Sequence, residues 1–125
     1  MSTVKGVNEL LLVVLDTNGK VFGGYIPTEL AFKESFFGSG EAFLFKLDQD
    51  QSSVVIFGST LENLHFVYCD SDGFGFGSDP YYGLFIDPEL TQGSTHACKT
   101  YANDLLTIVN HFAIKRLELW SVRRQ

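Results

Sequence analysis

The feature that most constrains the fold is an apolar run followed directly by a tight-turn signal. Leu10–Leu15 is continuously apolar and too short for a typical buried helix, so it predicts a strand covered on both faces. The next residues are Asp16-Thr17-Asn18-Gly19, and Asn-Gly between apolar segments is the strongest short-range signal for a β-hairpin. Lys20–Ile26 is the expected partner strand, which Pro27 ends because proline cannot donate to a ladder. These segments predict an antiparallel β-protein.

Further short segments repeat the strand signal. Between Ala42 and Leu47, the side chains alternate with period two, which predicts a strand with one core face. Other predicted strands are Val54–Phe57, His65–Cys69, Tyr82–Asp87 and Phe112–Trp120. The last of these changes the phase of its apolar alternation, which a bulge near Lys115-Arg116 would reconcile. The expected core contains Phe43, Phe45, Leu47, Leu84, Ile86, Leu117 and Trp120.

The remaining segments are expected to be connections. Asp70–Pro80 is rich in glycine, and Thr28–Lys33 could form one turn of helix. Pro88–Asn110 is expected to be long and mostly irregular, and such loops inside a compact domain are often functional. Six or seven strands with little helix predict a mainly β fold, in which two antiparallel sheets pack as a β-sandwich.

Composition and charge exclude several classes of function. The chain of 125 residues has the size of one domain. Its net charge of −6, from 9 basic and 15 acidic residues, argues against nucleic acid as a partner because phosphate is bound by clustered Lys and Arg. No run approaches the roughly 20 apolar residues of a membrane helix, and no signal peptide is visible. Two cysteines, Cys69 and Cys98, form neither a disulfide framework nor a zinc site, so we expect a reduced, cytoplasmic protein.

Five blocks of residues follow one another along most of the chain. In order, they are Val21-Phe22-Gly23-Gly24-Tyr25; Phe37-Gly38-Ser39-Gly40-Glu41; Tyr82-Gly83-Leu84-Phe85-Ile86-Asp87; Leu90 and Gly93 with His96-Ala97-Cys98-Lys99-Thr100-Tyr101 and Asn103; and Leu117-Glu118-Leu119-Trp120. Together they resemble the TLDc domain of the oxidation-resistance protein family. The chain departs from the family pattern where Phe57-Gly58-Ser59 stands in place of a Trp-Thr-Gly segment.

The resemblance implies a β-sandwich flanked by short helices, here as one domain over residues 1–125 that lacks the family's N-terminal helical segment. It also implies a role in oxidative-stress protection and in regulating the vacuolar-type proton ATPase, whose peripheral sector the domain would bind. The residues of the family signature, and the expected partner-binding positions, are Gly38, Gly40, Glu41, Gly83, Asp87, Gly93, His96 and Cys98. Because an apolar sheet face would be left uncovered without the helical segment, we also expect self-association or marginal stability.

The candidate chemical residues have structural interpretations beside the functional ones. Glu41 could present a carboxylate to a ligand, but we favour a carboxylate that accepts backbone N–H bonds. Asp87 could orient a histidine, but Asp more often caps the turn that follows it. Cys98 is a candidate redox thiol beside Lys99, or a small buried side chain that anchors its loop, which we favour.

No catalytic or ligand-binding motif is complete. Ser94 and His96 with Asp87 or Glu41 supply the residue types of a hydrolase triad, but no Gly-x-Ser-x-Gly is present. Asp70-Ser71-Asp72-Gly73 lacks the further ligands of a calcium loop, and the glycines after it do not form a dinucleotide fingerprint. We therefore expect no catalytic set, metal site or cofactor.

The first functional hypothesis is a non-catalytic protein-interaction module. The alternative is a redox-active or hydrolytic enzyme that uses Cys98 or a site formed by Glu41 and His96. A third hypothesis is a partial domain without activity of its own. Thiol reactivity would separate the first two hypotheses, and the oligomeric state bears on the third.

Overall fold

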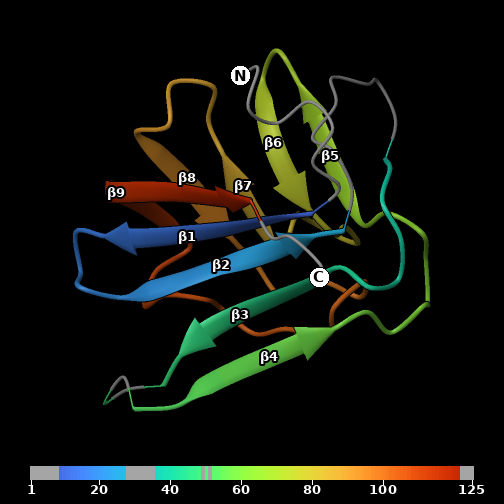
Figure 1. The fold of residues 1–125 in the computed structure, drawn as a ribbon, viewed down its shortest axis with the longest axis horizontal. Coiled ribbons are helices and arrows are strands. Elements are labelled where there is room, and N and C mark those ends of the chain that lie inside the picture. The colour runs from blue at the N-terminus through green and yellow to red at the C-terminus, as the bar shows by residue number, and fades with distance from the viewer. Residues whose placement is uncertain (1–8, 28–35, 49, 51, 122–125) are drawn as a thin grey trace.

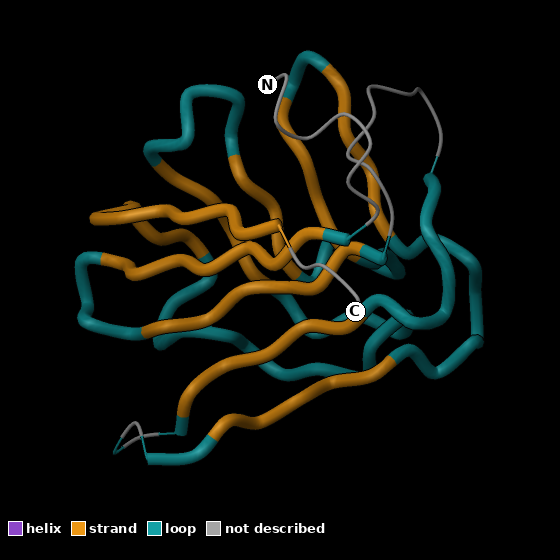
Figure 2. The backbone as a smooth tube through the Cα atoms, viewed as in Figure 1, coloured by secondary structure: helices purple, strands orange, loops and turns teal. Residues whose placement is uncertain are grey.

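The structure is a computed structural model, and it describes residues 9–27, 36–48, 50 and 52–121. These residues form nine strands and no helix, and Figure 2 shows only strands and loops among them. The strands are β1 (Leu10–Asp16), β2 (Val21–Ile26), β3 (Phe43–Leu47), β4 (Val54–Gly58), β5 (Val67–Asp70), β6 (Gly73–Phe76), β7 (Leu84–Ile86), β8 (Gln92–Thr95) and β9 (His111–Ser121). All pairings are antiparallel, in the order β4-β3-β2-β1-β9-β8-β7-β6-β5. The expected mainly β fold is confirmed.

The predicted pair of separate sheets is wrong, because β9 joins all strands into one sheet. The first residues of β9 pair with β8, up to Ala113 opposite Gln92, and the rest pair with β1. Figure 1 shows β1 and β2 in front of β7 and β8, so the sheet turns back on itself. The edge-on contact between the rings of Phe22 on β2 and Phe112 on β9, with centroids 4.9 Å apart, lies inside this fold. The sheet has two halves, β1–β4 on one side of β9 and β5–β8 on the other. The two halves share one core, and β9 runs through both.

The predicted bulge in the last strand is confirmed. Leu15 is opposite Arg116 and Asp16 is opposite Ile114, so Lys115 is the extra residue on β9. A bulge increases the local twist of a strand. It lies close to the point where β9 leaves β8 and continues along β1. The broken alternation in the sequence therefore marks the place where the sheet divides.

Several predicted connections and flanking elements differ from the structure. The flanking helices are not found in the described part of the chain, and the predicted helical turn at Thr28–Lys33 lies outside it. The connection expected at Asp70–Pro80 contains β6, and the irregular segment expected at Pro88–Asn110 contains β8. β6 was missed because its glycines carry no strand signal of their own. At Gly75 an added Cβ would lie 2.5 Å from the Tyr82 ring, so the absence of a side chain there lets an aromatic side chain cover the strand.

The core confirms the prediction on β7 but reverses it on β3. Leu84 and Ile86 are fully buried. On β3, however, Leu44 belongs to the main core cluster with Ala42, whereas the predicted side chains Phe43, Phe45 and Leu47 lie on the opposite face. Of these three, Phe45 is buried as predicted, and Phe43 and Leu47 are half-buried. Both faces of β3 are apolar, so alternation by itself could not select the buried one. Leu117 packs partly buried against the core.

The pairing of β2 with β3 decides the face. Leu44 lies opposite Gly24, and a Cβ on Gly24 would approach the Phe76 ring to 2.6 Å. Because β2 and β6 are not neighbours in the sheet, this contact also shows that the two halves face each other. Trp120, expected in the core, is 56% exposed and lies opposite Leu11 on the outer face.

Among the described residues, no helix is long and apolar enough to cross a membrane.

Candidate functional site

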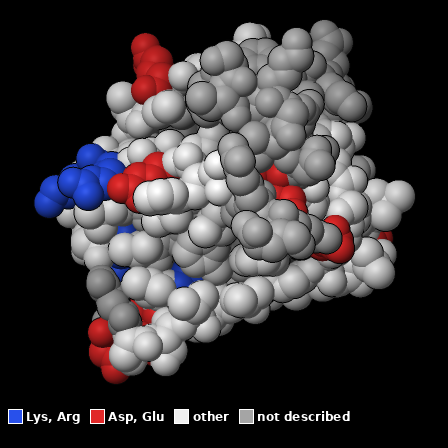
Figure 3. Space-filling model, viewed as in Figure 1, with Lys and Arg blue, Asp and Glu red and all other residues white. Residues whose placement is uncertain are grey.

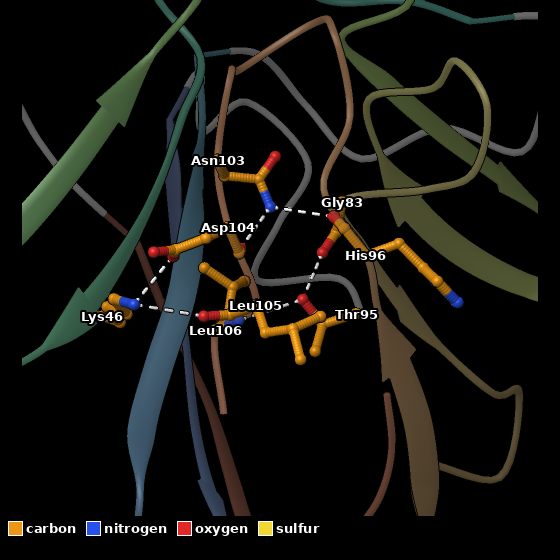
Figure 4. Close-up of polar contacts among 8 residues, drawn as sticks. All are labelled: Lys46, Gly83, Thr95, His96, Asn103, Asp104, Leu105 and Leu106. Carbon is orange, nitrogen blue, oxygen red and sulfur yellow. Dashed lines mark hydrogen bonds and ion pairs between the residues drawn. The ribbon is translucent and has the colours of Figure 1, made fainter. Parts of the chain in front are cut away.

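The segment that follows β8 is irregular, but buried polar side chains hold it in place. The Thr95 hydroxyl donates to the Gly83 carbonyl at 2.6 Å and accepts from the Leu106 N–H at 3.2 Å. The Asn103 side-chain amide donates to the His96 carbonyl at 2.9 Å. Figure 4 shows these contacts, with the His96 ring pointing away from them. Thr95 and Asn103 are buried, so these bonds fix the loop against β7 without access to water.

A second part of the same network reaches β3. The Lys46 ammonium donates to the Asp104 carboxylate at 2.8 Å and to the Leu105 carbonyl at 3.2 Å (Figure 4). Asp104 is well exposed, so the charge pair itself contributes little stability. The hydrogen bond from Lys46 to the Leu105 carbonyl is more important for positioning the loop, because it connects the end of the loop to the opposite half of the sheet.

Cys98 is a packed side chain inside this loop. It is 4% exposed, and its Sγ donates to the Asn103 carboxamide oxygen at 3.1 Å. A Cβ on Gly77 would lie 2.8 Å from this sulfur, so glycine leaves the space that the thiol fills. Burial raises the pKa of the Cys98 thiol, and hydrogen bonds from backbone N–H groups offset this only in part. These observations favour the anchoring interpretation over a reactive thiolate.

His96 lines a small pocket with aromatic walls. The pocket has a volume of about 320 Å³ and is lined by Phe36, Ser78, Pro80, Tyr81, Tyr82, Ser94 and His96. The His96 ring lies 4.8 Å from the Tyr81 ring and 6.3 Å from the His111 ring, between centroids. Its Nδ1 is buried and has no hydrogen-bond partner among the described residues. Sequence reasoning missed Tyr81 and Tyr82 as site residues, although their position beside Pro80 and Gly83 was visible.

The residue types of a hydrolase triad are not assembled around this pocket. Ser94 and His96 both line it, but Asp87 and Glu41 are not among its described lining residues. In the part of the chain that the structure describes, no hydrogen bond or ion pair joins Glu41 to His96. A triad is defined by its geometry, and here only two of its residue types line the same pocket.

Asp87 caps the turn between β7 and β8. Its carboxylate accepts the backbone N–H groups of Thr91 at 2.9 Å and Gln92 at 3.3 Å, and the Thr91 hydroxyl at 3.0 Å. Desolvation alone would raise the pKa of Asp87, but these hydrogen bonds outweigh it and lower the pKa. None of these contacts orients a histidine. Asp87 instead stabilises the turn that follows it.

The glycine loop with Glu41 lies at an exposed end of the molecule. Gly38 has φ +98°, a conformation that favours glycine, and Glu41 is exposed. The carboxylate of Glu41 accepts no hydrogen bond among the described residues, unlike the interpretation favoured from the sequence. A Cβ on Gly40 would lie 3.0 Å from the Leu61 side chain, so the loop packs against the segment after β4.

That segment connects the glycine loop to the loop after β8. The Thr60 N–H donates to the Thr100 carbonyl at 2.9 Å, and the Thr60 hydroxyl donates to the Lys99 carbonyl at 2.7 Å. Leu61, next to Thr60, is 64% exposed. We call Gly38–Glu41, Thr60, Leu61 and Lys99 the loop-end surface. This surface contains three of the predicted site residues, Gly38, Gly40 and Glu41. It also contains Lys99, which follows Cys98 in the sequence.

Two further predicted site residues, Gly83 and Gly93, are needed for close packing. Gly93 lies in β8, where an added Cβ would come within 2.1 Å of the Phe85 carbonyl oxygen. Gly83 packs against Leu44, with 2.8 Å between its ideal Cβ position and that side chain. Within the described ranges, no group of His, Cys, Asp and Glu side chains is arranged to hold a metal ion. The predicted positions therefore divide into packing glycines, a turn cap, a loop anchor and exposed loop residues.

Fold and site together define a class: a single-core antiparallel β-domain whose loops are held by glycines and buried polar side chains. Within this class, the chain belongs to the TLDc domain family, whose model matches residues 1–123. It is 32% identical to human oxidation resistance protein 1 over 113 residues, which are 90% of this chain and 13% of that protein. It is also 29% identical to mouse nuclear receptor coactivator 7 over 113 residues, 90% of this chain and 12% of that protein. The chain thus spans about an eighth of the length of these relatives.

Proposed function

We propose that this chain is a cytoplasmic, non-catalytic interaction module of oxidative-stress protection, which regulates the vacuolar-type proton ATPase by binding its peripheral sector. Membership of the TLDc family carries the proposal. The name of the human relative, oxidation resistance protein 1, supports the link to oxidative stress. The ATPase as partner rests on the sequence resemblance to the family.

The loop-end surface is the proposed contact. Its glycine loop carries the family signature, and Thr60 links it by two hydrogen bonds to the loop that contains Cys98. It offers an exposed leucine, Leu61, beside an exposed carboxylate, Glu41. An apolar side chain that becomes buried, with charges around it, is the usual arrangement at the centre of a protein contact.

Capture of the purified peripheral sector of the ATPase by the immobilised chain tests this proposal. Leu61→Asn and Glu41→Ala should each weaken capture about fivefold or more. Leu61 has φ 63°, which Asn tolerates, so the fold should be kept. Leu90→Asn is the matched control, because Leu90 is also an exposed leucine with φ 63° but lies in another turn. No capture by the unaltered chain would refute the partner, and equal capture by Leu61→Asn would refute the surface.

A further inference from the structure

A large cleft lies where the sheet divides. It has a volume of about 690 Å³, within the range of pockets that hold ligands. Leu12, Leu117 and Leu119 of β1 and β9 line one side, and Phe74 and Leu90 line the other. The cleft therefore separates the second part of β9 from the β5–β6 hairpin and the turn between β7 and β8. No part of the proposed loop-end surface lines it.

The lining of the cleft is mostly apolar and remains accessible. Leu117 and Leu119 are only half-buried, although they lie opposite Val14 and Leu12, which are fully buried. Leu90 is 44% exposed at the mouth. Side chains of this kind gain free energy in proportion to the apolar area removed from water. An apolar occupant would therefore be bound here by the same effect that forms the core.

Beside the cleft runs an edge of β9 that pairs with no other described strand. β8 pairs with β9 only as far as Ala113, and the last backbone bond to this side comes from Ile114, whose N–H donates to the Thr91 carbonyl at 2.9 Å. From Lys115 to Ser121, β9 pairs only with β1 among the described strands. Unpaired N–H and C=O groups along such an edge can accept an added strand. An edge without a partner among the described strands, together with an apolar cleft, fits an extended peptide.

Charge around the cleft selects the kind of peptide. Asp70 lines the cleft, and Asp72 and Glu89 are exposed in its two flanking turns. No Lys or Arg is among the described residues that line it. The nearest basic residues on β9 are Lys115 and Arg116 at the bulge, and the Arg116 guanidinium lies 4.0 Å from the Glu118 carboxylate on the outer face. On the face shown in Figure 3, most of the visible Lys and Arg atoms gather at the left edge, and Asp and Glu atoms occur at several places.

The structure points to a second interaction surface, distinct from the loop-end surface: the cleft binds an extended peptide segment of a protein partner. This segment adds to the edge of β9 at Lys115–Ser121 and places alternate apolar side chains between Leu119 and Leu90. Lys or Arg residues between them face the carboxylates of the two turns. Backbone pairing supplies affinity, and the cleft and its acidic rim supply specificity.

A defined peptide probe tests this on the full chain. The probe is a fluorescent peptide in which Lys alternates with Val and Leu, and its control has Glu in place of every Lys. Fluorescence anisotropy should show saturable binding of the Lys peptide and weaker binding of the Glu peptide. Leu90→Asn should weaken binding of the Lys peptide about five- to tenfold, the effect of losing part of one buried leucine. Leu61→Asn should leave it unchanged, which is the reverse of the pattern expected for the ATPase.

Two further measurements complete the test. Glu89→Lys should weaken binding of the Lys peptide, because it reverses one charge of the rim. Hydrogen exchange should show that the peptide protects backbone amides within Lys115–Ser121. Absence of binding, equal binding of both peptides, or protection elsewhere in the chain overturns the proposal. Sedimentation that shows a dimer dissociated by Leu90→Asn, but not by the peptide, also overturns it, because the cleft would then bind a second copy.

Discussion

The carboxylate of Asp16 gives the sharpest test of how the fold is held together. It ends β1 and is fully buried. One oxygen accepts the backbone N–H groups of Asn18 at 3.0 Å and Lys20 at 2.9 Å, and the other accepts the Thr107 hydroxyl. One side chain therefore shapes the first hairpin and attaches it to the segment before β9. This contact joins residues far apart in the sequence, so it should matter far more than an ordinary turn cap.

Asp16→Ala should lower the free energy of unfolding by about 3–5 kcal/mol. Each buried donor left without an acceptor costs about 1–3 kcal/mol. Thr107 is buried and Lys20 is half-buried, so two donors carry most of this loss, whereas the N–H of exposed Asn18 can bond water. Thr107→Val should cost less, about 1–2 kcal/mol, because the carboxylate keeps its two backbone donors. The two substitutions together should cost less than their sum, since they remove one shared contact.

Urea denaturation followed by circular dichroism gives the free energies. Asp48→Ala is the matched control: Asp48 caps the turn between β3 and β4 by accepting the N–H groups of Ser52 at 3.0 Å and Ser53 at 3.3 Å, both exposed. It should cost about 1 kcal/mol or less. If Asp16→Ala and Asp48→Ala cost the same, or if the losses for Asp16→Ala and Thr107→Val simply add, the tertiary role assigned to Asp16 is wrong.

Three further outcomes are expected. Gly93→Ala should destabilise the fold by about 2–3 kcal/mol in urea, because its Cβ would meet a backbone oxygen at 2.1 Å, whereas Gly58→Ala, with open space around it, should be nearly neutral; equal effects would contradict this packing. Thiol labelling of Cys98, like that of buried Cys69, should be slow at neutral pH and become fast only in denaturant, since burial raises both thiol pKa values; rapid labelling of native Cys98 would support a redox role instead. Because the pKa of Asp87 is lowered by folding, its stabilisation should be fully present above the unfolded pKa of about 4 and lost as the pH falls below it. The difference in thermal midpoint between the wild type and Asp87→Asn should therefore shrink on acidification, and a constant difference would count against the cap.

Part of the candidate site was visible in the sequence, and the rest depended on tertiary contacts. Asp87 was expected to cap its turn and Cys98 to anchor its loop, and both roles follow from local residue preferences. Glu41 was expected to accept backbone bonds, but its loop turns outward and leaves it exposed. The pocket at His96 and the cleft beside Leu117 combine residues from distant strands, and nothing in the order of the residues places them together.

The sequence by itself determined the local elements of this protein. Asn18-Gly19 defines the first hairpin because few turns match the twist of two antiparallel strands. The broken alternation of the last strand defines the bulge at Lys115, because a change of phase requires one extra residue. Both are properties of neighbouring residues, so a single segment contains all the information.

Only the tertiary structure decided which faces are buried and how the halves join. β3 is apolar on both sides, and Leu44 is buried because its partner Gly24 leaves room for the Phe76 ring from the other half. One strand, β9, pairs with β8 at its start and with β1 beyond the bulge, so two expected sheets became one. Pairing partners and facing layers are chosen by the whole set of strands competing to bury apolar area, and no segment carries that choice alone.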